Sequence, residues 1–328
     1  MRYTLPRLLG AVTLGQALRF AAALGLGGGL GRRMGRFSTN VSMVAASESV
    51  PIPRTPAPTP SHSVIPGTSE VEDQPVVTPL CEASTVMVVG GTRGIGLEFV
   101  QQLLSKGCNV IATHRGSAPP AELAALGACH AGKFSTLSMD VGDEASIAAA
   151  ADKLSQESTQ LTHIIHNAGI YGPPGSLDGQ ERFGRPAASP TTKEAMMDVF
   201  SINAVGPFLV AQQFSKVLGA PSGQLPIIAI LTSKVGSVDD NGSGGAYAYR
   251  ASKSACNIIA KSLYVDLRSE EKATMVLLHP GYVRTDMTSG KGLIDADESV
   301  AGMLRAVEAT GPSVPFRFVD YKACRIPW

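Results

Sequence analysis

Cysteine is scarce in this sequence, and the few cysteines lie far apart. The chain of 328 residues has five of them, Cys81, Cys108, Cys129, Cys256 and Cys324, and no C-x-x-C motif. An odd number of scattered cysteines predicts neither a disulfide framework nor a zinc site. His163 and His166 do not form a metal pair either, because residues three apart on a strand point to opposite faces of the sheet. We expect reduced thiols and no metal.

Acidic residues are absent before Glu48, whereas six arginines occur there. These are Arg2, Arg7, Arg19, Arg32, Arg33 and Arg36. An Arg-rich, acid-free stretch that mixes Leu, Ala and Gly with Ser and Thr is typical of import signals, so residues 1–45 are expected to be an organellar targeting segment. Removing these six charges from the formal net charge of +1 leaves −5 for the rest of the chain. A mildly acidic folded part gives no support for nucleic-acid binding, which usually requires a basic surface.

Long apolar runs without charge are also missing. Arg19 divides the apolar N-terminal region into uncharged runs of 11 residues (8–18) and 12 residues (20–31). A membrane-spanning helix needs about 20 residues, so no stable membrane insertion is expected. The arginines continue beyond the apolar region, which disfavours a secretory signal. The Ser, Thr and Pro content beyond residue 38 favours import into a plastid, with the mitochondrion as the alternative organelle and the cytoplasm as the location without import.

The rest of the chain divides into a linker and a folded domain. Residues 46–80 are rich in Pro, Ser and Thr and lack apolar periodicity, which predicts a disordered linker. In residues 81–328, short apolar runs alternate with longer helical patterns. The expected strands are TVMVVG, NVIAT, STLSMD, THIIHNAG, PIIAILTS and ATMVLLHPG. This alternation predicts an α/β fold, a doubly wound parallel sheet with helices on both faces.

The first expected strand runs into a glycine-rich turn, VVGGTRGIG. Gly90, Gly94 and Gly96 allow the backbone to turn tightly and to approach a pyrophosphate, which then faces the start of the following helix. The second strand ends in NVIATHRGS, without the acidic residue that would bind the ribose of NAD. Arg93 in the glycine turn and Arg115 after the second strand could each pair with a phosphate. The sequence therefore predicts NADP as the cofactor.

A second motif is AYAYRASKSA, in which two tyrosines precede one lysine. On a helix a lysine lies beside the residue four positions earlier, so Lys253 is the neighbour of Tyr249 and not of Tyr247. A phenol with an ordinary pKa of about 10 is a poor proton shuttle at neutral pH, and a nearby positive charge lowers that pKa. We therefore expect Tyr249 to be a general acid or base whose pKa is lowered by Lys253.

With these two motifs in this order, the sequence resembles the short-chain dehydrogenase/reductase family from about residue 84 to the C-terminus. The landmarks between and after them are MDV, HNAG, SINAVGP, LTSKVGS and HPGYVRTDM. The resemblance implies a single Rossmann-type domain with a sheet of about seven strands. Two residues depart from the family pattern: His166 stands in place of the usual first Asn of its motif, and Val89 stands where Thr is more common.

One branch of the family is most similar. The runs AYAYRASKSACN and SKVGS and the final IPW look most like the C-factor and sniffer-type carbonyl reductases. Arg317 and Ala323 differ from that branch, because glycines are expected at these two positions.

Together with the motifs above, the resemblance implies a role for each matching residue. The catalytic residues are Asn203, Ser233, Tyr249 and Lys253. The cofactor-binding residues are Gly90, Thr92, Arg93, Gly94, Ile95, Gly96, Arg115, Asp140, Val141, Asn167, Ala168, Gly169, Tyr249, Lys253, Pro280, Gly281, Val283 and Thr285.

These residues predict an NADP-dependent oxidoreductase that reduces an aldehyde or ketone to an alcohol, or catalyses the reverse. Ser233 would donate a hydrogen bond to the carbonyl oxygen, and Tyr249 would deliver the proton. The resemblance implies that Lys253 also binds the nicotinamide ribose and that Asn203 holds a water linking Lys253 to solvent. The alternative is a signalling or redox-sensing protein that binds the cofactor without significant turnover.

The expected partners are a small carbonyl or alcohol substrate and further copies of the chain. The irregular segments 170–190 and 287–299 are expected to shape the substrate site, since such loops often carry function. Their composition names no substrate. The family habit of pairing through the helices that carry Asn203 and Tyr249 implies a homodimer or homotetramer.

Overall fold

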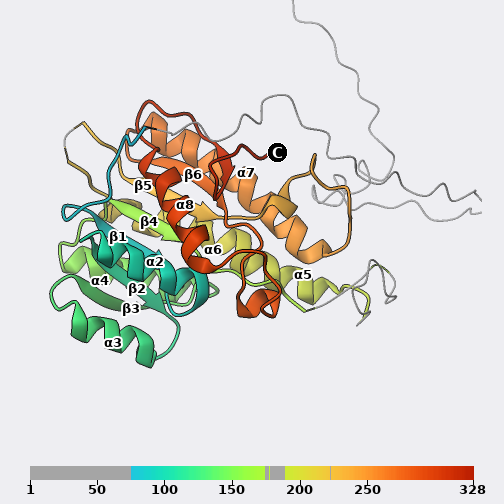
Figure 1. Ribbon diagram of the computed structural model, residues 1–328, viewed down its shortest axis with the longest axis horizontal. Coiled ribbons are helices and arrows are strands. Elements are labelled where there is room, and N and C mark those ends of the chain that lie inside the picture. The colour runs from blue at the N-terminus through green and yellow to red at the C-terminus, as the bar shows by residue number, and fades with distance from the viewer. Residues whose placement is uncertain (1–74, 174–176, 178–188, 222) are drawn as a thin grey trace, which may run out of the picture. The chain divides into compact units, whose positions relative to one another are not determined.

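A parallel sheet of seven strands forms the centre of the folded domain (Figure 1). The computed structural model describes residues 75–173, 177, 189–221 and 223–328, so the predicted targeting segment lies outside the described residues. The strands are β1 (Thr85–Val89), β2 (Asn109–His114), β3 (Phe134–Ser138), β4 (His163–His166), β5 (Ile227–Leu231), β6 (Thr274–His279) and β7 (Phe318–Asp320). The predicted doubly wound α/β fold is confirmed.

The order of the strands is β3-β2-β1-β4-β5-β6-β7, and every neighbouring pair is parallel. The chain therefore moves outward from β1 to β3, crosses over, and moves outward again from β4 to β7. In open α/β sheets, ligands bind beyond the carboxyl ends of the strands at the point where this direction reverses. That point lies between β1 and β4.

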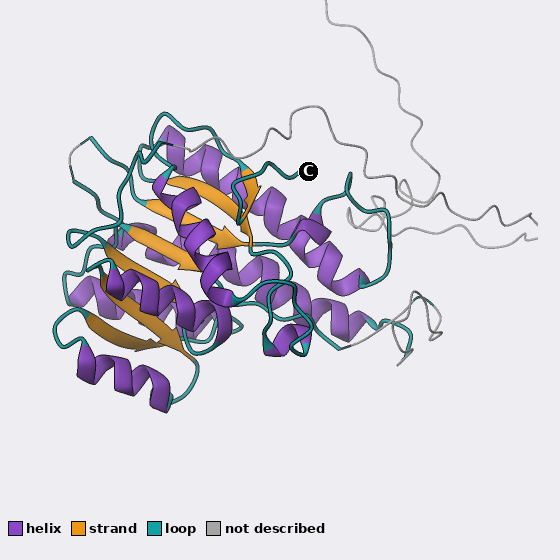
Figure 2. Cartoon of the chain, viewed as in Figure 1, coloured by secondary structure: helices purple, strands orange, loops and turns teal. Residues whose placement is uncertain are grey.

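Helices cover both faces of the sheet (Figure 2). They are α2 (Gly94–Ser105), α3 (Ala121–Cys129), α4 (Glu144–Gln156), α5 (Lys193–Phe200), α6 (Gly206–Phe214), α7 (Tyr247–Ser269) and α8 (Ala296–Glu308). A π-helix, η1 (Ser201–Val205), joins α5 to α6, and short 3-10 segments are η2 (Ser215–Val217), η3 (Lys234–Gly236) and η4 (Asp286–Thr288). Buried residues of α2, α3 and α8 pack on one face, and those of α4, α6 and α7 pack on the other.

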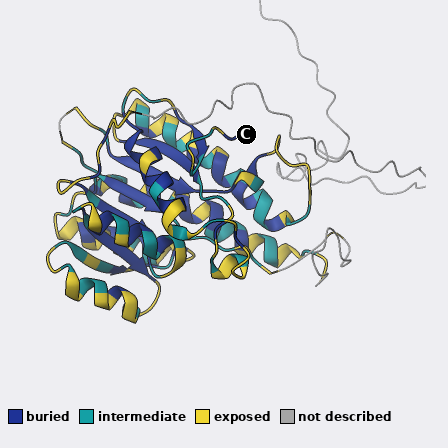
Figure 3. Cartoon of the chain, viewed as in Figure 1, coloured by how far each residue is buried: buried dark blue, intermediate teal, exposed yellow. Residues whose placement is uncertain are grey.

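Strands β1, β2, β4, β5 and β6 are almost fully buried (Figure 3), whereas the edge strand β3 buries only Leu137. The Val, Ile and Leu content of the inner strands follows from this position, since a parallel strand covered on both faces has no polar side. Helix α4 shows the complementary pattern. Its N-cap is Asp143, whose side chain accepts a hydrogen bond from Ala145 N, and the helix buries Ile147, Ala150 and Leu154 at helical spacing.

The folded domain begins earlier than the sequence indicated. The backbone N–H groups of Val77 and Thr78 donate to Glu308 O at 2.8 and 2.9 Å, and Leu80 N donates to the Glu308 carboxylate at 3.2 Å. Lys106 pairs with the same carboxylate at 2.9 Å. Residues 77–80 were predicted to belong to the disordered linker. This prediction is wrong for them, because their backbone groups are paired with α8.

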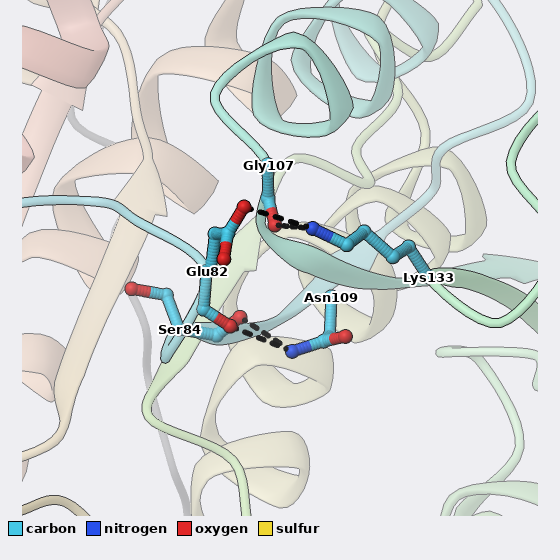
Figure 4. Close-up of polar contacts among 5 residues, drawn as sticks. All are labelled: Glu82, Ser84, Gly107, Asn109 and Lys133. Carbon is cyan, nitrogen blue, oxygen red and sulfur yellow. Dashed lines mark hydrogen bonds and ion pairs between the residues drawn. The ribbon is translucent and has the colours of Figure 1, made fainter.

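The amino ends of the first three strands are joined by polar contacts (Figure 4). Lys133 Nζ donates to Gly107 O at 3.1 Å and pairs with the Glu82 carboxylate at 3.5 Å. The Asn109 amide donates to Glu82 O and Ser84 O at 3.1 and 3.5 Å. These contacts lie at the end of the sheet opposite to the carboxyl ends, and the exposed ion pair among them adds little stability.

One helical stretch in the described part of the chain, Lys193–Val217, is long and apolar enough to cross a membrane by length and composition. Val210, Ala211 and Phe214 of this stretch are buried in the core against the sheet. Core helices of globular domains pass the same test, and this packing is that of a core helix.

Candidate active site

The glycine turn after β1 is packed too tightly for larger residues. Gly90 has a φ of +80°, a left-handed conformation that favours glycine. A Cβ added to Gly96 would lie 2.0 Å from Gly90 O and 2.6 Å from the Asn167 amide nitrogen. The same Asn167 amide donates to Gly90 O at 2.9 Å, and Gly90 N donates to Thr113 Oγ1 at 2.9 Å. The turn is thereby held against β2 and the segment after β4.

This turn fits a diphosphate. Arg93 precedes α2 in an extended conformation, and no side chain caps the helix. The first N–H groups of a helix have no partner within the helix, so they are available to an anion. The Thr285 methyl group lies 3.5 Å from the position of a Cβ on Gly94, which brings the segment after β6 against the turn. Thr92 and Ile95 are half-buried beside these residues.

The two arginines predicted to bind a phosphate differ in their surroundings. Arg93 pairs with Asp286 at 3.3 Å, and both side chains are exposed. Arg115 is exposed directly after β2 and makes no hydrogen bond or ion pair with any described residue. Arg115 is therefore the arginine whose charge is available at the end of β2.

Asp140 and Val141 lie at the carboxyl side of β3. Asp140 Oδ1 accepts a hydrogen bond from Gly142 N at 2.9 Å, and Asp140 N donates to Ser146 Oγ at 2.9 Å. Val141 is buried. These contacts position the turn into α4 beside the end of β2.

The segment after β4 lies against the glycine turn. The backbone N–H groups of Asn167 and Ala168 both donate to Val89 O, at 3.0 and 2.9 Å. A Cβ on Gly90 would lie 3.0 Å from Ala168, and a Cβ on Gly169 would lie 3.1 Å from Asn203 Oδ1. The predicted cofactor residues of β1 and β4 are thus brought together.

The residues predicted after β6 form a turn of their own. Gly281 has a φ of +82°, and a Cβ there would lie 3.0 Å from Ile294 and Tyr321. Ser299 Oγ donates to Pro280 O at 2.6 Å, and Val283 is buried. The close packing explains why this turn contains glycine.

Helix α7 begins at Tyr247, so Tyr249 and Lys253 lie one turn apart on it. Tyr247 is exposed, whereas Tyr249 is half-buried and Lys253 is buried. Lys253 Nζ lies 5.8 Å from the centroid of the Tyr249 ring. The expected pairing of the lysine with Tyr249 matches this arrangement.

The expected effect of the lysine on the tyrosine is wrong for this structure. Burial of the hydroxyl raises the pKa of Tyr249 from 10.0 to about 12, and a hydrogen bond with the Ser233 side chain offsets part of this rise. Lys253 Nζ donates instead to Leu231 O at 3.0 Å, and burial lowers the pKa of Lys253. Desolvation is the largest cause of the rise, and Lys253 is not among the groups that shift this pKa.

Asn203 lies in the π-helix η1 and is fully buried. Its amide nitrogen donates to Ile170 O at 2.8 Å and to Ser252 Oγ at 3.1 Å, and its oxygen accepts from Ile170 N at 2.8 Å. The side chain therefore fixes the segment after β4 against α7. π-helical turns are rare and frequent at functional sites, but no feature of the sequence marked this one.

Sequence reasoning missed Tyr171. Its ring packs on that of Tyr249, with centroids 4.9 Å apart and an angle of 38° between the planes. Its place two residues after the HNAG motif was the only available signal. Tyr171 is the second residue of the predicted substrate segment 170–190, of which residues 174–176 and 178–188 lie outside the described residues.

His166, which departs from the family pattern, is buried at the carboxyl end of β4. Neither ring nitrogen has a hydrogen-bond partner among the described residues. Burial, and secondly the charge of Lys253, lowers the pKa of His166 to about 3, so the imidazole is neutral.

The site therefore gathers a glycine turn, a serine, a tyrosine and a lysine at the carboxyl ends of neighbouring strands. The family model for short chain dehydrogenases matches residues 84–293, which is more than half of the chain. The chain belongs to the short-chain dehydrogenase family.

Individual members of this family are similar over much of the chain. The C-signal protein of Myxococcus xanthus is 44% identical over 133 residues, which are 40% of this chain and 78% of that protein. The NADPH-bound carbonyl reductase from chicken fatty liver is 30% identical, with a TM-score of 0.66 over 76% of this chain and 95% of that chain. Carbonyl reductase Sniffer of D. melanogaster is 27% identical, with a TM-score of 0.65 over 75% of this chain and 99% of that chain. The predicted similarity to the C-factor and sniffer-type branch is confirmed.

Proposed function

We propose that this short-chain dehydrogenase is an NADPH-dependent carbonyl reductase in which Tyr249 is the proton donor. The observation that carries the proposal is the hydrogen bond between Tyr249 and Ser233, with the buried Lys253 one helical turn away on α7. The Tyr249 hydroxyl is protonated at neutral pH, as the hydroxyl of an ordinary tyrosine is. It is therefore in the correct state to donate a proton to a carbonyl oxygen as that oxygen gains charge.

The cofactor part of the proposal rests on the glycine turn and on Arg115. When bound, NADPH supplies the hydride for the carbonyl carbon. The turn at Gly90–Gly96 and the uncapped start of α2 would hold its diphosphate. Arg115, exposed and without an acidic neighbour at the end of β2, would pair with the 2′-phosphate. The chicken enzyme with this fold has NADPH bound.

The other three predicted catalytic residues would contact the substrate, the cofactor or a water molecule beside Tyr249. The Ser233 hydroxyl can donate to the substrate oxygen while Tyr249 protonates it. Lys253, buried between Leu231 O and Gly169, would contact the nicotinamide ribose. Asn203 holds the backbone of Ile170 in place beside Tyr249 and would connect Lys253 to solvent through a water.

The direct test is turnover by the purified protein. NADPH absorbance is followed in the presence of a panel of aldehydes, ketones and quinones, with NADH as the comparison cofactor. We expect at least one compound to be reduced to its alcohol, identified by mass spectrometry, with NADPH preferred. Tight NADPH binding without turnover of any compound would contradict the proposal.

Such binding without turnover would support the second candidate, a cofactor-binding signalling protein. The specific observation in its favour is the 44% identity to the C-signal protein over 133 residues. The observation against it is that Ser233, Tyr249 and Lys253 are all present and close together, which a protein without turnover does not require.

We also propose that the protein forms a homodimer or homotetramer through α5, η1 and α7. Apolar side chains are exposed on these helices: Met197 is 60% exposed, Val205 43%, Ile258 64% and Val265 51%. Extended patches of exposed apolar side chains often mark interfaces between proteins. Light scattering should give a mass of two or four chains. The double variant Met197→Glu and Ile258→Glu should give a single chain, while Leu293→Glu, at another exposed apolar site, should not.

For the N-terminal region, we propose import into an organelle, with the plastid favoured over the mitochondrion. Residues 1–80 fused to a fluorescent reporter should direct it to that organelle in the native host, and substitution of the six arginines by glutamine should abolish the localisation. A diffuse cytosolic signal from the unmodified fusion would contradict this proposal.

A further inference from the structure

The chain reverses direction after β7 and returns along that strand. Val319 and Arg325 form an antiparallel bridge, Asp320 N donates to Cys324 O at 2.9 Å, and Ile326 N donates to Phe318 O at 2.9 Å. These contacts fix the course of the segment 324–328, which we call the tail. The tail ends beside residues 237–239, which follow the candidate catalytic Ser233 in sequence.

The backbone oxygen of Trp328 is the point where the tail meets this loop. It accepts hydrogen bonds from Val238 N at 3.1 Å, Asp239 N at 3.0 Å and Ser237 Oγ at 3.2 Å. Ser237 is 2% exposed, and its hydroxyl also accepts from Asp240 N at 3.1 Å. One residue of the tail therefore pairs with three consecutive residues of the loop.

The indole of Trp328 is held by aromatic rings. It is stacked on Phe316, with centroids 5.7 Å apart and planes 3° from parallel, and it contacts Phe318 of β7 at 6.0 Å. Phe316 in turn packs on Tyr264 of α7 at 5.1 Å, and Lys261 Nζ lies 5.3 Å from the Phe316 ring centroid. The ring stack anchors the tail to α7, the helix that carries Tyr249.

The beginning of the same loop is held by α7 directly. Arg250 Nη1 donates to Val235 O at 3.2 Å, and Ser254 Oγ donates to Gly236 O at 2.7 Å. A Cβ on Gly236 would lie 2.7 Å from Lys253 Cβ, so the loop packs on the helix without space between them. The loop from Ser233 to Asp239 is thus fixed by α7 at its start and by Trp328 at its end.

We propose that Trp328 is a positioning residue for the catalytic pair, because its carbonyl and its ring together hold the loop that directs the Ser233 hydroxyl toward Tyr249. This inference rests on the proposed reductase function. Trp328 does not touch the reacting atoms and acts through the loop. Exchange of its ring should release the carbonyl from the loop, because the tail then loses its contacts with Phe316 and Phe318.

Loosening of the loop should have a defined effect on the chemistry. The hydrogen bond between Ser233 and Tyr249 depends on the position of this loop. A loop that no longer holds Ser233 in place should therefore lower kcat, because the proton donor loses its partner. The KM for NADPH should stay within twofold of the unmodified value, since the glycine turn and Arg115 lie at other strands. Loss of stability alone would not lower the kcat of the folded protein while leaving this KM unchanged.

The test compares three variants of the full chain: Trp328→Ala, Trp328→Phe and Leu154→Ala. Leu154 is buried near the end of α4, away from the loop, so its variant controls for loss of stability alone. We expect kcat of Trp328→Ala to fall at least fivefold while the KM for NADPH stays within twofold of the unmodified value. Trp328→Phe, which keeps an aromatic ring, should restore most of the activity, and Leu154→Ala should keep the kcat of the unmodified protein.

Hydrogen exchange separates the failure of this inference from failure of the proposed function. The amides of Val238 and Asp239, which donate to Trp328 O, should exchange at least tenfold faster in Trp328→Ala than in the other two variants, whether or not a substrate is known. Unchanged exchange at these amides would overturn the inference. So would faster exchange combined with unchanged kcat in a protein that reduces carbonyl compounds. Absence of turnover in the unmodified protein would contradict only the reductase function.

Discussion

Replacement of Tyr249 by Phe removes one hydroxyl and leaves the ring in place. The ring contacts that hold this residue, with Tyr171 at 4.9 Å and with Lys253 Nζ at 5.8 Å, do not require the hydroxyl. The contact that is lost is the hydrogen bond with Ser233. The change is therefore confined to the proton donor and its partner.

The expected effects on stability and on catalysis differ in size. One hydrogen bond contributes about 1 kcal/mol, so the free energy of unfolding should change by no more than about that amount, or about 2–4 °C in Tm for a domain of this size. A positioned general acid contributes about 10²–10⁴ in rate, which corresponds to about 3–5 kcal/mol of transition-state stabilisation. We expect kcat to fall by at least a factor of about 100 while the Kd for NADPH changes by less than about threefold.

The assay measures steady-state turnover and NADPH binding by fluorescence for Tyr249→Phe and for Tyr247→Phe. Tyr247→Phe removes the same hydroxyl group from the same helix, but Tyr247 is exposed, so this variant should keep the activity of the unmodified protein. A Tyr247→Phe variant that is inactive, beside an active Tyr249→Phe variant, would refute the assignment of the acid. So would an equal loss of NADPH binding and of kcat in Tyr249→Phe.

Three further predictions follow from the same geometry. In a binding titration the unmodified protein should bind NADPH at least tenfold more tightly than NADH, a difference of about 1.4 kcal/mol. Arg115→Asp should reduce or reverse this preference for NADPH. Equal affinities of the unmodified protein for the two cofactors would contradict the role of Arg115. In a urea titration Gly96→Ala should lower the free energy of unfolding by about 1–3 kcal/mol, since the added Cβ would lie 2.0 Å from Gly90 O, and the same variant should bind NADPH more weakly. Gly242→Ala, with no atom within 4 Å of the added Cβ, should change neither the free energy of unfolding nor NADPH binding. The unfolded chain binds a proton at His166 below pH 6.5, whereas the native chain does so only near pH 3, so the stability of the native protein should fall as pH decreases through this range. In thermal melts between pH 7 and pH 4, the Tm of His166→Asn should fall less steeply than that of the unmodified protein. Identical slopes of Tm against pH would show that this histidine is not responsible.

The architecture was largely predictable because it depends on patterns within short stretches. Six of the seven strands were located from the alternation of short strand-like runs with longer helical patterns, and the inner strands among them are apolar because both their faces are buried. The seventh, Phe318–Asp320, has only three residues and was not assigned to any segment, since so short a run has no periodicity. The start of the domain was placed too late for a related reason. Residues 77–80 carry a linker-like composition, and only their pairing with Glu308, more than two hundred residues later, orders them.

The sequence alone determined the relations between residues that are close in the chain. It placed the glycine turn between a strand and a helix, and it paired Lys253 with Tyr249 by helical spacing. The tertiary structure decided everything that depends on distant segments: the π-helical turn that buries Asn203, the contact of Trp328 with the loop after Ser233, and the pKa of Tyr249. The physical reason is that a pKa depends on desolvation, which is the sum of all groups packed around the hydroxyl. Four-residue spacing brought the ammonium close, but the fold turned it toward Leu231 O, and burial then raised the pKa that the charge was expected to lower.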